Sequence, residues 1–225
     1  MDIDPRSWWH NREFAASSGG YLVPGDVVPR RVLELEPWDT ARRDLLVLLL
    51  RDLTERRIEG DMAELGVYKG GTARLLHHYA PERKLYLFNT FAGSDRRDVR
   101  AERASTGRET SERDFSDTYV GLVLRNIAPQ NDNVQVYPGF FPESAPESVR
   151  NRRFAFVHLD ADLYEPILAG LEYFYPRTNR GEFLVVRDFH SWPGARKAVR
   201  EFFQDKPETP VPTSDKSGSV VIVKL

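Results

Sequence analysis

Hydrophobic and polar positions follow two different periods along the chain. Between residues 40 and 57, leucines recur at positions i, i+3, i+4 and i+7 and charges fill the other side, which predicts an amphipathic helix. Either Asp39 or Thr40 can cap its start. Elsewhere, short apolar runs are bounded by turn residues, as in Lys84 to Phe88. Runs of that length are typical of buried strands.

The same patterns divide the rest of the chain into alternating strands and helices. Strands are predicted at residues 61–66, 84–88, 133–137, 153–159 and 182–186, with extended segments at 209–213 and 219–224. Helices are predicted at residues 72–79, 116–127, 144–151 and 163–175, and after a candidate cap at Ser191. This alternation predicts a doubly wound, mostly parallel α/β sheet that ends in an antiparallel hairpin.

Two segments lie outside this pattern. Residues 1–36 scatter aromatic side chains among Gly, Ser and Pro, and predict an irregular arm that packs on the main body, on a partner subunit or over a substrate. Residues 92–115 are dense in charge and almost lack apolar anchors, so we expect a solvated loop. A long loop at the edge of a sheet can also be a lid that recognises substrate, and its arginines would suit phosphate, carboxylate or hydroxyl groups.

Composition limits the kinds of function. The 225 residues carry a formal net charge of -2 and are 40% hydrophobic, which suits one globular domain, here residues 37–225. The near-neutral charge argues against a nucleic-acid partner. The chain has no cysteine, which excludes disulfides and thiolate chemistry and fits a cytoplasmic protein. No apolar run approaches the roughly 20 residues of a membrane span.

A glycine-rich turn is the first candidate site. Gly66, Gly70 and Gly71 lie between a predicted strand and helix, an arrangement that points backbone N–H groups at an anionic or carboxylate-bearing ligand. The spacing differs from the dinucleotide fingerprint, and these glycines could simply make a tight turn. The next strand ends at Asn89, where an acid usually binds ribose hydroxyls in nucleoside-binding folds.

Two further strand ends carry polar or aromatic side chains. Asp160 and Asp162 follow a buried strand, where one could hold a cation and the other accept a proton, or one could cap the next helix. Phe140 and Phe141 follow another strand and could stack on a base or belong to the core.

Several of these motifs together resemble the macrocin O-methyltransferase family (TylF type), whose members use S-adenosylmethionine to methylate sugar hydroxyls of natural products. The resemblance runs from about residue 60 to 204. It rests on Glu64-Leu65-Gly66-Val67-Tyr68-Lys69-Gly70-Gly71, Asn89-Thr90-Phe91-Ala92-Gly93, Gly139-Phe140-Phe141, His158-Leu159-Asp160-Ala161-Asp162-Leu163-Tyr164-Glu165-Pro166 and Arg187-Asp188-Phe189.

The resemblance implies a seven-stranded, class I methyltransferase-like Rossmann fold and a set of residue roles. The methionine part of the cofactor would be held by Glu64, Gly66, Tyr68, Gly70 and Gly71, the ribose by Asn89 with Thr90, and the adenine by Phe140 with Gly139. Asp160 and Asp188 would be ligands of Mg²⁺, with Asp160 also beside the cofactor, and Asp162 would be the general base.

Two positions depart from the family pattern, which has Asp at position 89 and at position 187. Arg187 cannot ligate a metal and would repel a nearby divalent ion, so we hypothesise that metal binding is weak or absent. Arg187 would instead pair with Asp160 or Asp188 as a fixed cation, or point away. His190 could serve as a base or as a replacement ligand.

We therefore expect an S-adenosylmethionine-dependent O-methyltransferase that acts on a small-molecule glycoside or another polyhydroxyl compound. It would be a cytoplasmic homodimer without nucleic-acid or membrane partners. The alternatives are a protein of altered chemistry that binds the cofactor or a biosynthetic partner, and an enzyme that transfers to a different nucleophile.

Overall fold

The computed structural model describes residues 39–129 and 132–225. The predicted arm at residues 1–36 lies outside the described residues, so its proposed packing stays a prediction. The body begins with helix α3 (Thr40–Glu55), whose first turn is capped by Asp39: the Asp39 carboxylate accepts a hydrogen bond of 3.1 Å from the backbone N–H of Arg42.

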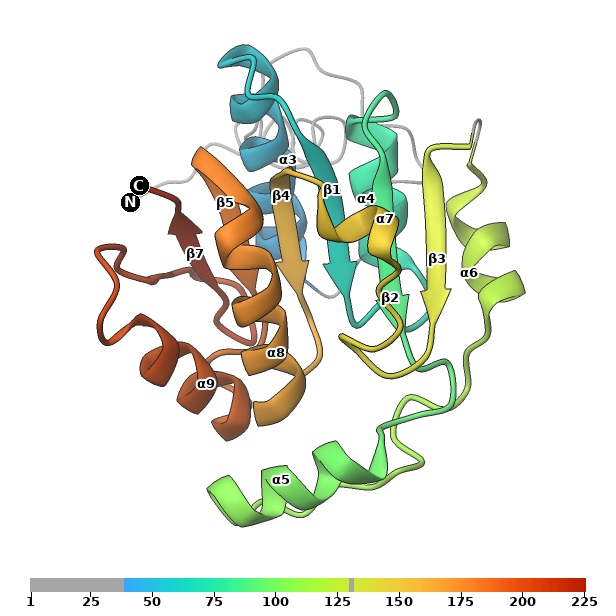
Figure 1. Ribbon diagram of the computed structural model, residues 1–225, viewed down its shortest axis with the longest axis vertical. Coiled ribbons are helices and arrows are strands. Elements are labelled where there is room, and N and C mark those ends of the chain that lie inside the picture. The colour runs from blue at the N-terminus through green and yellow to red at the C-terminus, as the bar shows by residue number, and fades with distance from the viewer. Residues whose placement is uncertain (1–38, 130–131) are drawn as a thin grey trace, which may run out of the picture.

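A seven-stranded sheet of order β3-β2-β1-β4-β5-β7-β6 forms the centre of the molecule (Figure 1). The first five strands run parallel to one another, and β7 lies antiparallel between β5 and β6. The strands are β1 (Asp61–Leu65), β2 (Leu85–Asn89), β3 (Val134–Pro138), β4 (Phe154–Leu159), β5 (Thr178–Val186), β6 (Val211–Pro212) and β7 (Val220–Val223). The predicted mostly parallel sheet with a closing antiparallel hairpin is confirmed.

Helices cover both faces of this sheet. They are α4 (Gly71–Tyr79), α5 (Arg96–Thr106), α6 (Val120–Ile127), α7 (Glu147–Arg150), α8 (Tyr164–Phe174) and α9 (Pro193–Phe203), with a 3₁₀ turn at Tyr175–Arg177. In Figure 1, α8 and α9 lie in front of the sheet, α3 and α4 lie behind it, and α5 crosses below the carboxyl ends of the strands.

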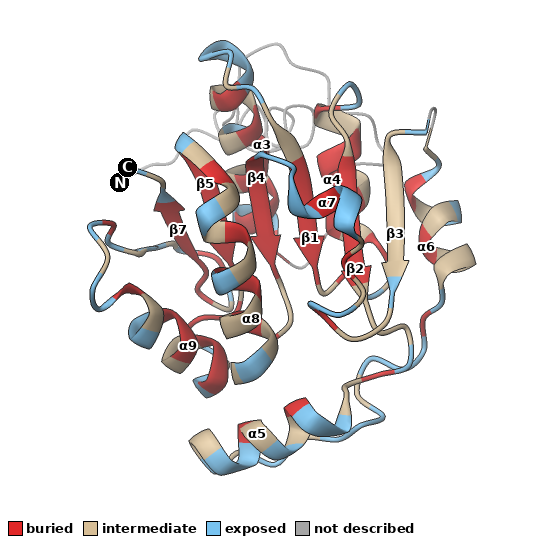
Figure 2. Cartoon of the chain, viewed as in Figure 1, coloured by how far each residue is buried: buried red, intermediate tan, exposed pale blue. Residues whose placement is uncertain are grey.

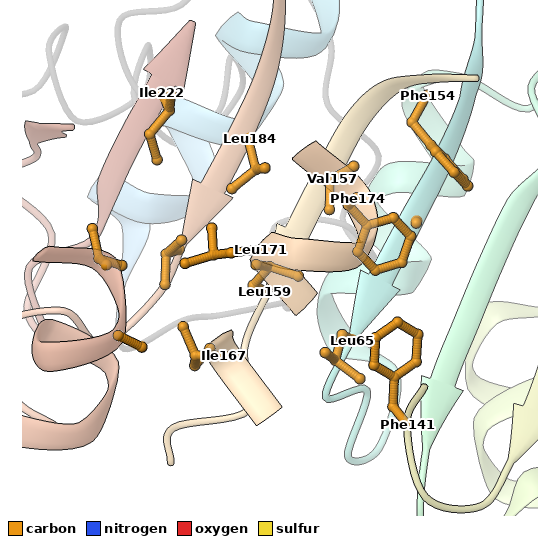
Figure 3. Packing of buried hydrophobic residues seen from close by; sticks show 14 of the residues in the cluster. Leu65, Phe141, Phe154, Val157, Leu159, Ile167, Leu171, Phe174, Leu184 and Ile222 are labelled. Carbon is orange, nitrogen blue, oxygen red and sulfur yellow. The ribbon is translucent and has the colours of Figure 1, made fainter. Parts of the chain in front are cut away.

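Two hydrophobic cores, one on each face, hold these layers together. On the α8 face, Leu171 and Phe174 pack with Val157 and Leu159 of β4 (Figure 3). On the other face, the predicted leucine stripe of α3 packs against α4 and against Phe156. All six residues of β4 are buried, as the red ribbon in Figure 2 shows. A strand buried on both faces is what a doubly wound sheet requires at its centre.

The largest correction to the sequence-based expectations concerns residues 92–115, for which the charge density predicts a solvated loop. They contain the eleven-residue helix α5. The carboxylate of Asp95 caps its start by accepting from the N–H of Arg97 at 2.8 Å, and Gly107 ends it in a left-handed conformation. The hydrophobic pattern of the sequence does not predict this helix, because α5 contacts the rest of the protein mainly through polar side chains.

Glu102 is the main attachment of α5. Its side chain is fully buried, and it accepts hydrogen bonds from the Tyr164 N–H at 2.8 Å and from the Thr106 hydroxyl at 2.9 Å. It therefore caps the first turn of α8. A Cβ atom on Gly194 would overlap the Glu102 carboxylate, so α9 admits this side chain only because residue 194 is glycine.

A smaller correction concerns the start of α9. The sequence predicts Ser191 as its cap, but the residue at the cap position is Trp192, which makes no capping hydrogen bond with its side chain. The Ser191 hydroxyl instead donates to the carbonyl of Asp188 at 3.3 Å. Among the helices of the described residues, none combines the length and the apolar character that crossing a membrane would need.

Candidate active site

A cavity lies where the parallel strands end, between the sheet and α5. It encloses about 930 Å³ of space when the part that opens to solvent is counted. Ligands of open α/β sheets bind at this edge. Nine of the residues singled out from the sequence line it: Gly66, Tyr68, Asn89, Thr90, Gly139, Phe140, Asp160, Asp162 and Arg187.

The glycine turn after β1 brings two pieces of backbone into close contact. Gly66 has a φ of 88°, and a Cβ atom there would overlap the backbone carbonyl of Asp160. Gly70, with a φ of 81°, is the cap residue that precedes α4, and it does not line the cavity. Only glycine fits position 66 without a clash, so the chain can turn here, between β1 and α4, in close contact with the backbone that follows β4. Gly71, the first residue of α4, does not line the cavity.

Asn89 links the second strand to this turn. Its side-chain oxygen accepts a hydrogen bond from the backbone N–H of Val67 at 3.3 Å. The side-chain NH₂ group makes no hydrogen bond within the described residues, and the side chain lines the cavity. Asn89 therefore fixes the glycine turn with its oxygen and has its NH₂ group left for a ligand.

The two phenylalanines after β3 have different roles. Phe141 is buried and stacks on Phe174 of α8, with ring centroids 5.5 Å apart, so it belongs to the core. Both phenylalanines reach the cavity wall, but Phe140 is only partly buried and its ring is not part of the core. The guanidinium of Arg97 from α5 lies 3.4 Å from the centroid of the Phe140 ring. Through this contact, α5 packs against the part of the cavity wall that follows β3.

Glu64 lies behind the cavity rather than in its wall. It is buried in β1, and one of its carboxylate oxygens lies 3.1 Å from Nδ1 of His158 on the neighbouring strand β4. Burial, with the nearby charge of Arg42, lowers the pKa of His158 well below its ordinary value. His158 is thus neutral and donates its Nδ1–H to Glu64. This hydrogen bond links β4 to β1 two residues before Gly66.

Arg187 at the end of β5 is the centre of a charged group. Its Nη1 atom lies 3.0 and 2.9 Å from the two carboxylate oxygens of Asp160, and its Nε atom lies 3.5 Å from Asp188. Burial disfavours the charged guanidinium, but Asp160 and Asp188 raise the pKa of Arg187 above its usual range. The sequence predicts pairing with Asp160 or Asp188; Arg187 pairs with Asp160, also contacts Asp188, and does not point away.

Asp162 and Asp188 share an unusual backbone conformation. Their φ angles are 61° and 59°, in the left-handed region that costs a non-glycine residue free energy. Both are buried, and one oxygen of each makes no hydrogen bond within the described residues. Burial, followed by the charges of Asp160 and Asp188, raises the pKa of Asp162 well above its ordinary value. Asp162 is therefore a stronger base than an exposed carboxylate.

The acidic residues alone could form a metal site, since ligand atoms of Asp160, Asp162 and Asp188 lie within 4.8 Å of one another. The Arg187 guanidinium, however, holds both oxygens of Asp160 and contacts Asp188. A divalent ion would have to displace this cation or accept its repulsion. The residues present therefore fit a fixed guanidinium better than a metal ion.

His190 is not placed for the chemistry expected of it. Its side chain is exposed and does not line the cavity, and its backbone N–H donates to the carbonyl of Gly218 at 3.1 Å. After the left-handed turn at Asp188 the chain leaves the strand end, which carries His190 away from the carboxylates. The interpretation of His190 as a base or replacement ligand is therefore wrong for this arrangement.

Sequence reasoning missed several residues of the cavity wall, among them Asp98, Thr110 and Trp192. Asp98 and Thr110 lie in the charged segment that has no hydrophobic pattern. Trp192 could have been found, since it follows the Arg187-Asp188-Phe189 motif by three residues and precedes a predicted helix.

The strand order and the polar cavity at the carboxyl edge define a class I O-methyltransferase-like fold. The solved structure of the O-methyltransferase NovP shares this fold, with a TM-score of 0.71 over 95% of this chain and 92% of that one at 20% identity. Residues 39–220 match the family model described as Macrocin-O-methyltransferase (TylF), and the chain belongs to that family.

Two curated relatives from Streptomyces are similar in sequence. The demethyldecarbamoylnovobiocin O-methyltransferase of Streptomyces niveus is 26% identical over 68% of this chain and 62% of its own length. The 8-demethyl-8-(2,3-dimethoxy-alpha-L-rhamnosyl)-tetracenomycin-C 4'-O-methyltransferase of Streptomyces olivaceus is 26% identical over 72% and 64%. The chain thus spans somewhat less than two thirds of the length of the relatives it matches.

Proposed function

We propose that this protein is an S-adenosylmethionine-dependent O-methyltransferase that methylates a hydroxyl group of a sugar or a related natural product. The observation that carries the proposal is Asp162, a buried carboxylate with an oxygen free of hydrogen bonds, in the same cavity as the glycine turn after β1. Family membership supports the reaction, and the names of both relatives describe O-methylation of natural products.

The cofactor would lie along the ends of β1, β2 and β3. The turn at Gly66 would approach its methionine part, the Asn89 NH₂ group its ribose and the Phe140 ring its adenine. The cofactor supplies a methyl group already activated on a sulfonium. The protein must then hold the acceptor hydroxyl in line and remove its proton as the new C–O bond forms.

Asp162 is the residue that we assign to this proton transfer. Its raised pKa follows from burial and from two neighbouring carboxylates, and makes it a better proton acceptor. Arg187 has a different role, because its guanidinium holds Asp160 in place and supplies a positive charge next to the reacting oxygen, where charge develops as the proton leaves. That is the help that a bound metal ion would otherwise give.

Calorimetry tests the first half of the proposal. S-adenosylhomocysteine and S-adenosylmethionine are titrated into the full chain, and both should bind. If neither binds, the protein is not a methyltransferase of this kind.

The role of Arg187 is tested by turnover with a panel of hydroxylated glycosides in the presence of excess EDTA. Activity should persist, because Arg187 occupies the position of a metal ligand. The variant Arg187→Asp supplies the carboxylate that the family pattern has at this position and should respond to added Mg²⁺. Arg187→Lys keeps the charge, cannot contact Asp160 and Asp188 in the same way, and should stay insensitive to Mg²⁺. A wild-type enzyme that requires added Mg²⁺ would refute this role.

The acceptor in this proposal is a small-molecule glycoside or polyhydroxyl compound, and a cytoplasmic homodimer remains our expectation for the assembly. Sedimentation of the full chain, compared with a chain lacking residues 1–36, tests whether the arm makes the dimer. A full-length monomer would contradict it.

A further inference from the structure

The part of the cavity wall formed by residues 92–115 contains two polar atoms without a hydrogen-bond partner in the described residues. Asp98, in the first turn of α5, is 6% exposed, and its Oδ1 atom makes no hydrogen bond within the described residues. The buried hydroxyl of Thr110, a few residues beyond the helix, also lacks a partner there. Both residues line the cavity. Buried polar groups of native proteins are rarely left without a partner, and water, an ion or a ligand completes those that the protein does not.

Within the described residues, Asp98 makes no ion pair. The charges that act on it are those of Asp95, Arg97 and Glu165, and of these three only Arg97 is positive. Arg97 is directed elsewhere, since its guanidinium contacts Asp95 and Glu143 and lies over the Phe140 ring. Burial, helped by the two acidic neighbours, raises the pKa of Asp98 to about 7. The protein itself thus leaves this carboxyl group short of positive charge.

The surfaces around Asp98 suit the carbon skeleton of a sugar. Leu163 and Pro166, at the start of α8, and Trp192 line the same cavity. One face of the Trp192 indole is covered by the guanidinium of Arg108, at 3.7 Å from the ring. Arg108 itself donates to the carbonyl of Ser191 at 3.0 Å, so the indole is held in place. Flat aromatic and apolar groups beside a carboxylate are suited to a ring with one strongly polar substituent.

The ligand group that fits Asp98 must supply both a hydrogen bond and a charge. A hydroxyl group can pair with Asp98 while the carboxyl group is protonated, but beside the ionised form it would leave a buried negative charge uncompensated, which is costly. A protonated amine donates to the carboxylate and to the Thr110 oxygen and also neutralises the charge. We propose that Asp98 and Thr110 bind a protonated amino group of the acceptor, so that the hydroxyl methylated by this enzyme belongs to an amino sugar.

This inference rests on the proposed function and names the substrate class of the same cavity. Its test uses matched pairs of methyl glycosides, each a 2-, 3- or 4-amino-deoxyhexose and its hydroxyl counterpart. Binding to the full chain saturated with S-adenosylhomocysteine is measured by ligand-observed NMR. In at least one pair, the amino sugar should bind about tenfold more tightly than its counterpart, as one charge-assisted hydrogen bond predicts.

The variant Asp98→Asn keeps the shape of the side chain and removes its charge, so it should abolish the preference for the amino member. Asp205→Asn, a change at an exposed residue outside the cavity, should leave the preference intact. The proposal is overturned if no amino member binds wild-type protein better than its counterpart, or if Asp98→Asn retains the preference. Calorimetry with S-adenosylhomocysteine on the same samples reports separately on the proposed methyltransferase function.

Discussion

At the ends of β1, β2 and β3 the cavity is bounded by backbone turns, whereas at the ends of β4 and β5 it is bounded by charged side chains. The first region depends on Gly66 and Asn89, which fix the path of the chain. The second depends on Asp160, Asp162 and Arg187: Arg187 pairs with Asp160, and the neighbouring carboxylates raise the pKa of Asp162. The comparison teaches that binding and chemistry are separable here: one region is sensitive to shape and the other to charge.

The largest expected effect is in the charged region. Asp162→Asn removes the proton acceptor and keeps the size of the side chain, so kcat should fall by about 10²- to 10⁴-fold. The affinity for S-adenosylhomocysteine should stay within about twofold, because the backbone turns are untouched. Steady-state kinetics and calorimetry on one preparation check both statements. Turnover that survives the change would show that Asp162 is not the base.

The reverse experiment alters the backbone region. Gly66→Ala places a methyl group against the carbonyl of Asp160 and should lower the free energy of unfolding by about 3 kcal/mol and abolish cofactor binding. Gly107→Ala is the matched control, since Gly107 has a φ of 76° but no atom near its absent side chain. It should cost only about 1 kcal/mol and leave cofactor affinity unchanged. Urea unfolding and calorimetry would contradict the interpretation if both variants behaved alike.

A carboxyl group outside both regions, Asp98 of α5, should make stability depend on pH. Burial raises the folded-state pKa of Asp98 from its ordinary value of 3.8 to about 7, so the folded protein holds this proton more tightly than the unfolded chain does. The resulting stabilisation is complete below about pH 4 and is lost as the pH rises through 7.

Asp98→Asn cannot titrate. Between pH 5 and pH 8, wild-type protein should therefore lose about 2 kcal/mol more stability than the variant. Urea unfolding at both pH values measures the difference. Equal losses in the two proteins would show that Asp98 keeps an ordinary pKa.

The smallest expected effect restores the family residue at the end of β2. Asn89→Asp keeps an oxygen for the Val67 N–H and offers a second oxygen to the ribose hydroxyls, so affinity for S-adenosylhomocysteine should rise by about threefold. Asn89→Ala loses both groups and should weaken binding. Calorimetry measures whether each variant binds S-adenosylhomocysteine more tightly or more weakly than the wild type. An unchanged affinity for Asn89→Asp would mean that the ribose lies elsewhere.

The sequence predicted the backbone region well because its signals are local. A glycine pattern between a strand and a helix, and an amide at the next strand end, place Gly66 and Asn89 without knowledge of distant contacts. The pairing of Arg187 with Asp160 was also predictable, because parallel strand ends bring residues 160 and 187 together and opposite charges attract.

Long-range polar packing was not predictable in the same way. Helix α5 docks through the Glu102 carboxylate, whose partner Tyr164 lies 62 residues away, and no hydrophobic period marks such a contact. The predicted role of His190 as a base or replacement ligand was wrong for a related reason. Its distance in sequence from Asp188 is short, but the left-handed turn at Asp188 changes the direction of the chain before His190 is reached.

The polar attachment of α5 has a consequence for how acceptor preference could change in this family. Three hydrogen bonds link this segment to the helices beside it: Glu102 to the first turn of α8, Lys197 to the carbonyl of Ser105, and Arg108 to Ser191. None of these three involves the two hydrophobic cores. Residues 92–115 could therefore be exchanged as one segment between family members. The recipient must have glycine at position 194, and the incoming segment must have an acid at position 102. Such chimeras would transplant selectivity and leave the folding of the sheet to the recipient.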